Sequence, residues 1–182
     1  MSTPDVLRWL GVLASSYLLG SIPTSYILGR LFFGVDPRKH GSGGTGATNS
    51  LRTLGGKAAL IVVVVDVSKG FAAVTLAGHL VISAADYGVT MSQWAMVVAC
   101  IFAIAGHAFS PWIGFKGGKG VATGAGSLLA MMPVVFWVEL VIFIAIVVTT
   151  RYVSLGSILI AAILPVWVIL FANSIPFIVL TT

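Results

Sequence analysis

The chain has 182 residues, of which 58% are hydrophobic and 8% charged, and its mean hydropathy is +1.08. A water-soluble domain of this size does not bury so much apolar surface and still cover itself with polar groups. The net charge of +5 lies in short segments between apolar runs, which favours cytoplasmic loops and anionic ligands over nucleic acid. Composition therefore predicts an all-α polytopic membrane protein whose solvent is the lipid bilayer, with residues 1–182 forming a single integral membrane domain.

Three apolar runs in the first part of the chain are long enough to cross a bilayer as helices, which takes roughly 20 residues. The first extends from about Val6 to Phe33, with a kink expected at Pro23. The second extends from about Ala58 to Ser83, and the third from about Ser92 to Phe109.

The distribution of basic residues predicts the orientation of these helices. The segment before the first run is poor in positive charge, whereas the loop after it holds Arg38, Lys39, Arg52 and Lys57. Short loops rich in Lys and Arg stay in the cytoplasm. We therefore expect the N-terminus outside, and both this loop and the loop with Lys116 and Lys119 on the cytoplasmic face.

The stretch Val121–Thr150 allows two interpretations. A single span would put Arg151 outside, whereas a break near Met132 and Pro133 leaves a short piece, tilted or re-entrant, before a full span from about Val134. We favour the break, because it keeps Arg151 in the cytoplasm.

The end of the chain holds one further span, from about Leu155 to Phe171. Asn173, Ser174 and Pro176 predict an outside turn. The apolar residues after this turn are too few to cross a bilayer, so they form either an interfacial stub or a last helix that is cut short.

Two glycine-rich loops carry most of the candidate chemistry. The first reads GSGGTGATN from Gly41, and the second reads GFKGGKGVATG from Gly114. Glycines let successive N–H groups point toward one anion and let a ligand approach the backbone, and a helix N-terminus adds positive charge. Solvated turns explain one such loop, but two on the same face of the membrane favour convergence on one phosphate site.

Two nucleotide-binding motifs do not account for these loops. The first loop matches the dinucleotide pattern, but a membrane helix precedes it instead of a strand. The second resembles a Walker A sequence, but the spacing before Gly118 and Lys119 is one residue short and Gly120 replaces Ser or Thr.

Other polar residues have more than one interpretation. Asp66 and Lys69 share a helix face and neutralise each other, either as a structural lock or in support of the site. His107, at the cytoplasmic end of its span, is either a satisfied helix-end residue or a site contact, and Glu139 is expected to be structural.

The sequence predicts no metal, no cofactor and no covalent serine mechanism. No His, Cys or carboxylate cluster has metal-ligand spacing, and a nucleophilic Ser42 would need a base beside it. We expect Ser42 instead to hydrogen-bond an anion or a reacting oxygen. Cys100 is the single cysteine, so no intrachain disulfide is possible.

Five segments of the chain resemble one family, in the family's order. They are SIPTSYILGR from Ser21, GSGGTGATNSLR from Gly41, DVSKG from Asp66, GHAFSPWIGFKGGKGVATG from Gly106 and RYVSLGSI from Arg151. The family is that of the acyl-phosphate-dependent glycerol-3-phosphate acyltransferases of bacterial inner membranes. The resemblance implies a seven-helix fold with the N-terminus outside. It also implies transfer of a fatty acyl group from acyl phosphate to the 1-hydroxyl of glycerol 3-phosphate, giving lysophosphatidic acid and phosphate.

The resemblance also implies roles in a phosphate-binding active site for Ser42, Thr48, Asn49, Arg52, Lys119 and a serine of the SLGSI segment. Of the two serines after Arg151, one is expected to cap a helix and the other to face the site. With the loop chemistry, the catalytic candidates are Ser42, Arg52, Lys119 and Ser157. The substrate-binding candidates are Gly41, Gly43, Gly46, Thr48, Asn49, Lys116, Gly117, Gly118, Gly120, Ser154 and His107.

Two departures from the family pattern stand out. Gly44 replaces the family's Asn in GSGN, and the chain ends before the family's cytoplasmic Arg-His and Asn segment and later Glu. We therefore expect a fragment or truncated variant with its last helix cut short, weak or inactive beside a C-terminally extended version.

Two other classes of function stay open at this point, an anion transporter and a non-catalytic membrane partner. A transporter is disfavoured because the glycines and lysines lie at the cytoplasmic edge and no inverted repeat is evident. Sequence leaves the oligomeric state and the acyl-chain preference open.

Overall fold

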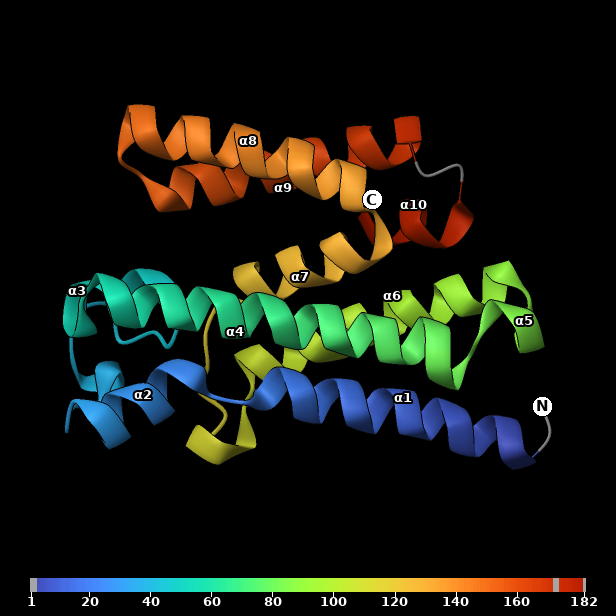
Figure 1. Ribbon diagram of the computed structural model, residues 1–182, viewed down its shortest axis with the longest axis horizontal. Helices are drawn as coiled ribbons and strands as arrows, with labels where there is room; N and C mark the ends of the chain where they lie inside the picture. The colour runs from blue at the N-terminus through green and yellow to red at the C-terminus, as the bar shows by residue number, and fades with distance from the viewer. Residues whose placement is uncertain (1–2, 172–173, 182) are drawn as a thin grey trace.

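Figure 1 shows the computed structural model, which describes residues 3–171 and 174–181. Throughout these residues the regular elements are helical. Within them, five segments are long and apolar enough to cross a membrane: Thr3–Phe32, Gly56–His79, Val89–Ile113, Pro133–Thr150 and Val153–Phe171. The prediction of an all-α polytopic membrane fold is confirmed.

The first span is divided into α1 (Thr3–Ser21) and α2 (Thr24–Phe32). Proline lacks an N–H group and disfavours helical geometry in the residue before it, so α1 ends at Ser21, before Ile22, and α2 begins after Pro23. The predicted kink is therefore a break in the helix.

The elements that follow include several short ones that hydropathy did not predict. From the break to the third span they are η1 (Pro37–Lys39), α3 (Ala47–Leu54), α4 (Gly56–Thr75), η2 (Leu76–Val81), α5 (Ala84–Tyr87) and α6 (Val89–Ala108). The rest of the chain forms η3 (Pro111–Ile113), α7 (Val121–Met131), α8 (Pro133–Thr150), α9 (Val153–Phe171) and α10 (Ile175–Thr181).

The favoured break near Met132 is confirmed, because α7 ends at Met131 and α8 begins at Pro133. Of the turn predicted after α9, Ser174 lies outside any helix, directly before α10. Asn173 lies outside the described residues, and Pro176 lies in the first turn of α10, where a missing N–H costs no helical hydrogen bond.

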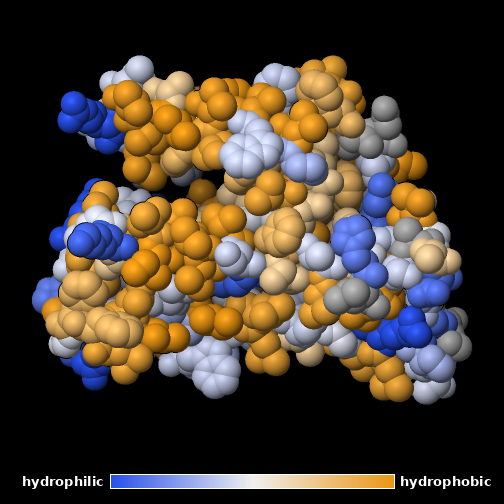
Figure 2. Space-filling model, in the orientation of Figure 1, coloured by the Kyte–Doolittle hydropathy of each residue, from blue (hydrophilic) through white to orange (hydrophobic). Residues whose placement is uncertain are grey.

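The helices form a bundle with a separate hairpin (Figure 1). Helices α1, α4 and α6 pack together, α7 lies on α4, and α8 and α9 form an antiparallel hairpin beyond α7. The turn between α8 and α9 lies at the same end of the molecule as α3, and α5 lies at the opposite end. Figure 2 shows a largely hydrophobic middle, with hydrophilic residues gathered at the two ends.

Glycines allow the bundle helices to approach closely. A Cβ atom on Gly20 of α1 would collide with the backbone of Ala103 in α6, and Gly106 of α6 is equally tight against α1. Gly70 and Gly126 have the same role between α4 and α7. Small residues are the usual basis of helix association in membranes, where lipid is as apolar as a leucine side chain.

We predict that Gly20→Ala destabilises the protein by about 1–3 kcal/mol, because the added methyl group overpacks the contact between α1 and α6. Gly11→Ala is the matched control in the same helix, since a Cβ atom there meets nothing within 4 Å. Alanine is the better helix former, so the control should be neutral or slightly stabilising. Thermal unfolding in detergent measures both, and equal midpoints for the two variants would contradict the packing argument.

Candidate active site

The first glycine loop, between η1 and α3, folds around the side chain of Asn49. Its Oδ1 atom accepts hydrogen bonds from the Ser42 N–H group at 2.8 Å and the Ser42 hydroxyl at 3.3 Å. Its Nδ2 atom donates to the carbonyl oxygens of Pro37 and Gly44, both at 2.8 Å. This uses both donors and both acceptor sites of the amide. We therefore interpret Asn49 as the residue that shapes the loop, where the sequence predicted a phosphate ligand.

Glycine is required beside this amide. Gly41 has a φ of +60°, in the left-handed region that L side chains rarely adopt, and a Cβ atom there would collide with Asn49 Oδ1. Gly43 also has a positive φ, of +72°. Ser42 is held between these two glycines with its side chain exposed.

Beyond Gly43 the loop leaves a row of backbone donors. Among the described residues, the N–H groups of residues 44–48 have no hydrogen-bond acceptor, and the last two open α3. The first N–H groups of a helix have no partner within the helix, and they lie at the positive end of its dipole. Thr48 is half-buried in this first turn, and Gly46 is the helix N-cap. These donors suit a phosphate group.

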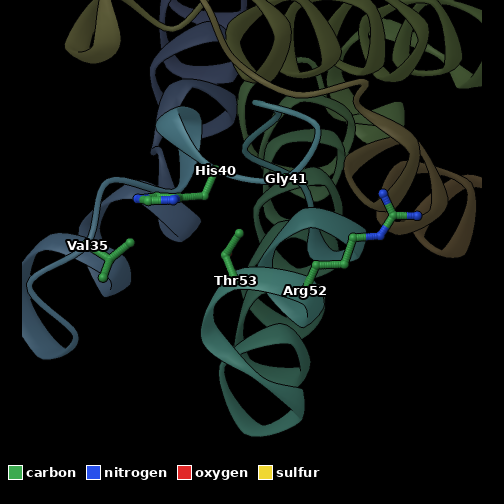
Figure 3. A pocket seen from close by; sticks show the side chains of 5 residues that line it. All are labelled: Val35, His40, Gly41, Arg52 and Thr53. Atoms are coloured by element: carbon green, nitrogen blue, oxygen red, sulfur yellow. The ribbon is translucent and has the colours of Figure 1, made fainter.

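An open hollow of about 340 Å³ lies against the first loop (Figure 3), lined by Val35, His40, Gly41, Arg52 and Thr53. Arg52 is exposed, and in Figure 3 its guanidinium group points away from His40 and Val35. Residues of the second loop do not line this hollow in the part of the chain that the structure describes.

Arg38 joins the two loop regions. Its guanidinium group donates to the Asp36 carboxylate at 2.8 and 3.0 Å, and its Nη1 atom donates to the carbonyl oxygen of Ile113 in η3 at 3.0 Å. It also lies 4.5 Å from the centroid of the Tyr26 ring. The prediction that both loops lie on the same side of the molecule is confirmed, and their convergence on one phosphate stays a prediction.

The second glycine loop packs against the end of α6. The Gly117 N–H group donates to the carbonyl oxygen of Ala108 at 2.9 Å, and the Gly118 N–H group donates to that of His107 at 3.2 Å. A Cβ atom on either glycine would collide with His107. These N–H groups therefore satisfy the last carbonyls of a helix, where the sequence predicted an anion cradle.

The loop's cations are left accessible. Lys116 and Lys119 are exposed, and neither has a carboxylate partner within the described part of the chain. Gly120 is the N-cap of α7 with a φ of +77°, and it packs against Ile104. The second loop can therefore contribute charge to a ligand through its lysines.

The two serines after Arg151 lie apart from both loops. Ser154 is exposed, and Ser157 is half-buried with its hydroxyl donating to the carbonyl oxygen of Val153 at 3.0 Å. Neither occupies the capping position before α9, because the helix begins at Val153 and includes both serines. Figure 2 shows a notch at the loop-bearing end, between the α8–α9 hairpin above and the layer of α3 and α4 below.

The buried polar cluster of α4 and α6 is larger than predicted. Lys69 Nζ lies 2.8 Å from Asp66 Oδ1, which confirms the predicted pair. It also lies 2.9 Å from His107 Nδ1, a contact between distant segments that no local pattern indicates. Glu139 is buried as well, with its Oε1 atom unpartnered among the described residues.

The architecture defines an integral membrane protein with two basic loops at one end. A family model described as glycerol-3-phosphate acyltransferase matches residues 10–182. The chain is 44% identical over 173 residues to glycerol-3-phosphate acyltransferase 2 of Moorella thermoacetica, covering 95% of this chain and 84% of that protein. It is 43% identical over 162 residues to the glycerol-3-phosphate acyltransferase of Chlorobaculum tepidum, covering 88% of this chain and 70% of that protein.

A solved structure agrees with these relatives. The crystal structure of PlsY (YgiH), described as an integral membrane glycerol 3-phosphate acyltransferase in its glycerol 3-phosphate form, aligns with a TM-score of 0.85. The two are 32% identical, and the alignment covers 95% of this chain and 82% of that one. The chain belongs to the glycerol-3-phosphate acyltransferase family, as its motifs predicted.

We predict that Gly41→Ala opens the first loop, because the new methyl group would displace Asn49 Oδ1 from Ser42. Gly34→Ala is the matched control: its φ of +63° gives it similar backbone strain, but a Cβ atom there meets nothing within 4 Å. Amide hydrogen exchange at Ser42 should accelerate by at least about tenfold in the first variant only. Equal exchange at Ser42 in both variants would show that Asn49 does not hold the loop.

The Asp36–Arg38 pair predicts a pH dependence of stability. The guanidinium group holds the pKa of the Asp36 carboxyl at about 2, below its ordinary 3.8. A lowered folded-state pKa means that the carboxylate stabilises the fold above about pH 4 and loses this effect as pH falls toward about 2. Asp36→Asn should therefore lower the unfolding midpoint at about pH 6 and change little near pH 2. A difference that stays constant over this range would exclude the ion pair as its cause.

Proposed function

We propose that this chain transfers a fatty acyl group from acyl phosphate to the 1-hydroxyl of glycerol 3-phosphate, giving lysophosphatidic acid and inorganic phosphate in phospholipid biosynthesis. The observation that carries this proposal is the pairing of two basic loops at one end of an apolar bundle through Arg38 and Ile113. Family membership supports it, and the solved relatives are described as glycerol 3-phosphate and lysophosphatidic acid forms.

For this reaction the protein mainly has to position the two substrates and neutralise their charge. Acyl phosphate is a mixed anhydride with a good leaving group. The 1-hydroxyl oxygen bonds to the acyl carbon, and the carbon–oxygen bond to phosphate breaks. Phosphate leaves with that electron pair and takes up the proton that the hydroxyl loses. Both reactants carry phosphate, so two adjacent anion sites would align them and offset their mutual repulsion.

The loops offer donors for both phosphates. On the first loop, the N–H groups of residues 44–48, which lack an acceptor among the described residues, and the guanidinium group of Arg52 suit one phosphate group. The Ser42 hydroxyl, which donates to Asn49 Oδ1 over 3.3 Å, would turn toward this phosphate on binding. On the second, Lys116 and Lys119 are accessible point charges. Ser157 lies on the α8–α9 hairpin, across the notch from the first loop. We assign it to this active site, because the family motif implies a role for a serine of this segment.

The membrane would separate the two parts of the lipid donor. Its acyl chain would stay among the apolar helix faces, while glycerol 3-phosphate reaches the loops from the water phase. We infer that the loops face the cytoplasm of a bacterial cell at its inner membrane, with the N-terminus outside. The basic charge of the loops and the bacterial relatives support this orientation.

We predict that membranes containing the chain convert palmitoyl phosphate and labelled glycerol 3-phosphate to labelled lysophosphatidic acid. Arg52→Ala and Lys119→Ala should each lower kcat/KM by roughly 100-fold, the order of magnitude lost when one donor to developing transition-state charge is removed. Lys57→Ala is the matched control, because Lys57 is an exposed cation at the start of α4 outside both loops. Its activity should match the wild type.

Three results would contradict parts of this assignment. Product from acyl coenzyme A but not from acyl phosphate would overturn the donor. Labelled phosphate that accumulates in vesicles without acylation would indicate an anion transporter. Equal losses in the Lys57 variant and the loop variants would overturn the roles of Arg52 and Lys119.

A further inference from the structure

Lys69 is buried in a membrane-spanning helix, with 4% of its side chain exposed. Its Nζ atom has three partners, each from a different element. They are Asp66 Oδ1 in α4 at 2.8 Å, the carbonyl oxygen of Ile22 at the α1–α2 break at 3.0 Å, and His107 Nδ1 in α6 at 2.9 Å. Charged residues at this depth are costly and usually functional, so the cluster calls for a specific explanation.

The hydrogen-bond donors and acceptors of this cluster determine the protonation state and tautomer of His107. A lysine ammonium has three N–H donors and no acceptor, and the carboxylate and the carbonyl can only accept. The Thr24 hydroxyl also donates to Asp66 Oδ1, at 3.1 Å, which supports the ionised carboxylate. His107 Nδ1 must therefore accept from Lys69, which leaves the imidazole neutral with its proton on Nε2.

The protonated Nε2 atom faces the second glycine loop. A Cβ atom on Gly118 would collide with it, and the Gly118 N–H group donates to the carbonyl oxygen of the same histidine at 3.2 Å. Among the described residues Nε2 has no hydrogen-bond partner. The cluster thus leaves the uncharged Nε2–H donor of His107 beside Gly118, the residue that precedes Lys119, without a partner among the described residues.

We propose that Lys69 is a positioning residue, which fixes the Nε2–H tautomer of His107 so that this N–H group donates to the substrate phosphate held by the Lys119 loop. Lys69 itself touches no substrate. The inference rests on the proposed function, because the phosphate is that of glycerol 3-phosphate or acyl phosphate. A purely structural lock would fix the same tautomer but would give the Nε2–H group no ligand, so the contact with phosphate separates the two roles.

The tautomer can be measured without any catalytic turnover. In the full chain labelled with ¹⁵N-histidine, the signals of His107 are those absent from His107→Gln. The proposal expects an unprotonated Nδ1 and a protonated Nε2 in the wild type. In Asp66→Asn/Lys69→Met, which leaves no unpaired buried charge, the preference should be lost. A protonated Nδ1 in the wild type, or an unchanged tautomer in the double variant, would overturn the role of Lys69. Because this readout needs no acyl transfer, its failure is distinct from failure of the proposed function.

Two substitutions of His107 test the contact with phosphate. Glutamine places its amide nitrogen near the position of Nε2, whereas asparagine places it near Nδ1. His107→Asn and the double variant should raise the KM for at least one phosphorylated substrate by about tenfold or more, the loss of one hydrogen bond to a charged group. His107→Gln should stay within about threefold of the wild type, because it keeps the donor.

The kinetic result is read together with unfolding midpoints. If the KM rises in His107→Asn and in the double variant while their midpoints stay near that of the wild type, the positioning role stands. If His107→Asn and His107→Gln have equal KM values, or if addition of glycerol 3-phosphate or inorganic phosphate leaves the wild-type Nε2 signal unmoved, the proposed donation to phosphate is wrong.

Discussion

The structure depends on one constraint: in hydrocarbon, a polar group must find its partner within the protein. The break at Pro23, the ammonium of Lys69 and the carboxylate of Asp66 meet this constraint together, because the ammonium bonds both the carboxylate and the Ile22 carbonyl. Glycines at the helix contacts bring α1, α4, α6 and α7 close enough for this cluster to form. The same core ties the break between α1 and α2 to the end of α6, and these segments lead into the two glycine loops.

The two loops use their glycines differently. In the first, the absence of a Cβ atom at Gly41 makes room for the Asn49 amide, which takes part in four hydrogen bonds. The next N–H groups have no acceptor among the described residues. In the second, Gly117 and Gly118 lie against His107, and their N–H groups close the end of α6. The first loop therefore offers backbone donors and Arg52 to an anion, and the second offers lysine side chains.

Local features of the sequence predicted much of the fold. The apolar runs predicted the membrane spans, and the prolines predicted where the helices are interrupted, at Pro23 and Pro133. Both features depend only on residues that are neighbours in the sequence. The Asp66–Lys69 pair followed from helical spacing. The role of Asn49 and the packing of Gly118 on His107 depend on contacts between distant segments. The bond of Ser157 within α9 depends on a choice among local partners. Spacing alone does not specify these.

The central claim is that two anion sites lie side by side and hold both phosphorylated reactants at once. Simultaneous binding is its most direct test. The dissociation constant of glycerol 3-phosphate is measured calorimetrically with and without a saturating acyl phosphonate, which mimics acyl phosphate but cannot transfer its acyl group. The account predicts that glycerol 3-phosphate still binds in the presence of the phosphonate. Strict competition between the two ligands would mean one shared anion site and would contradict it.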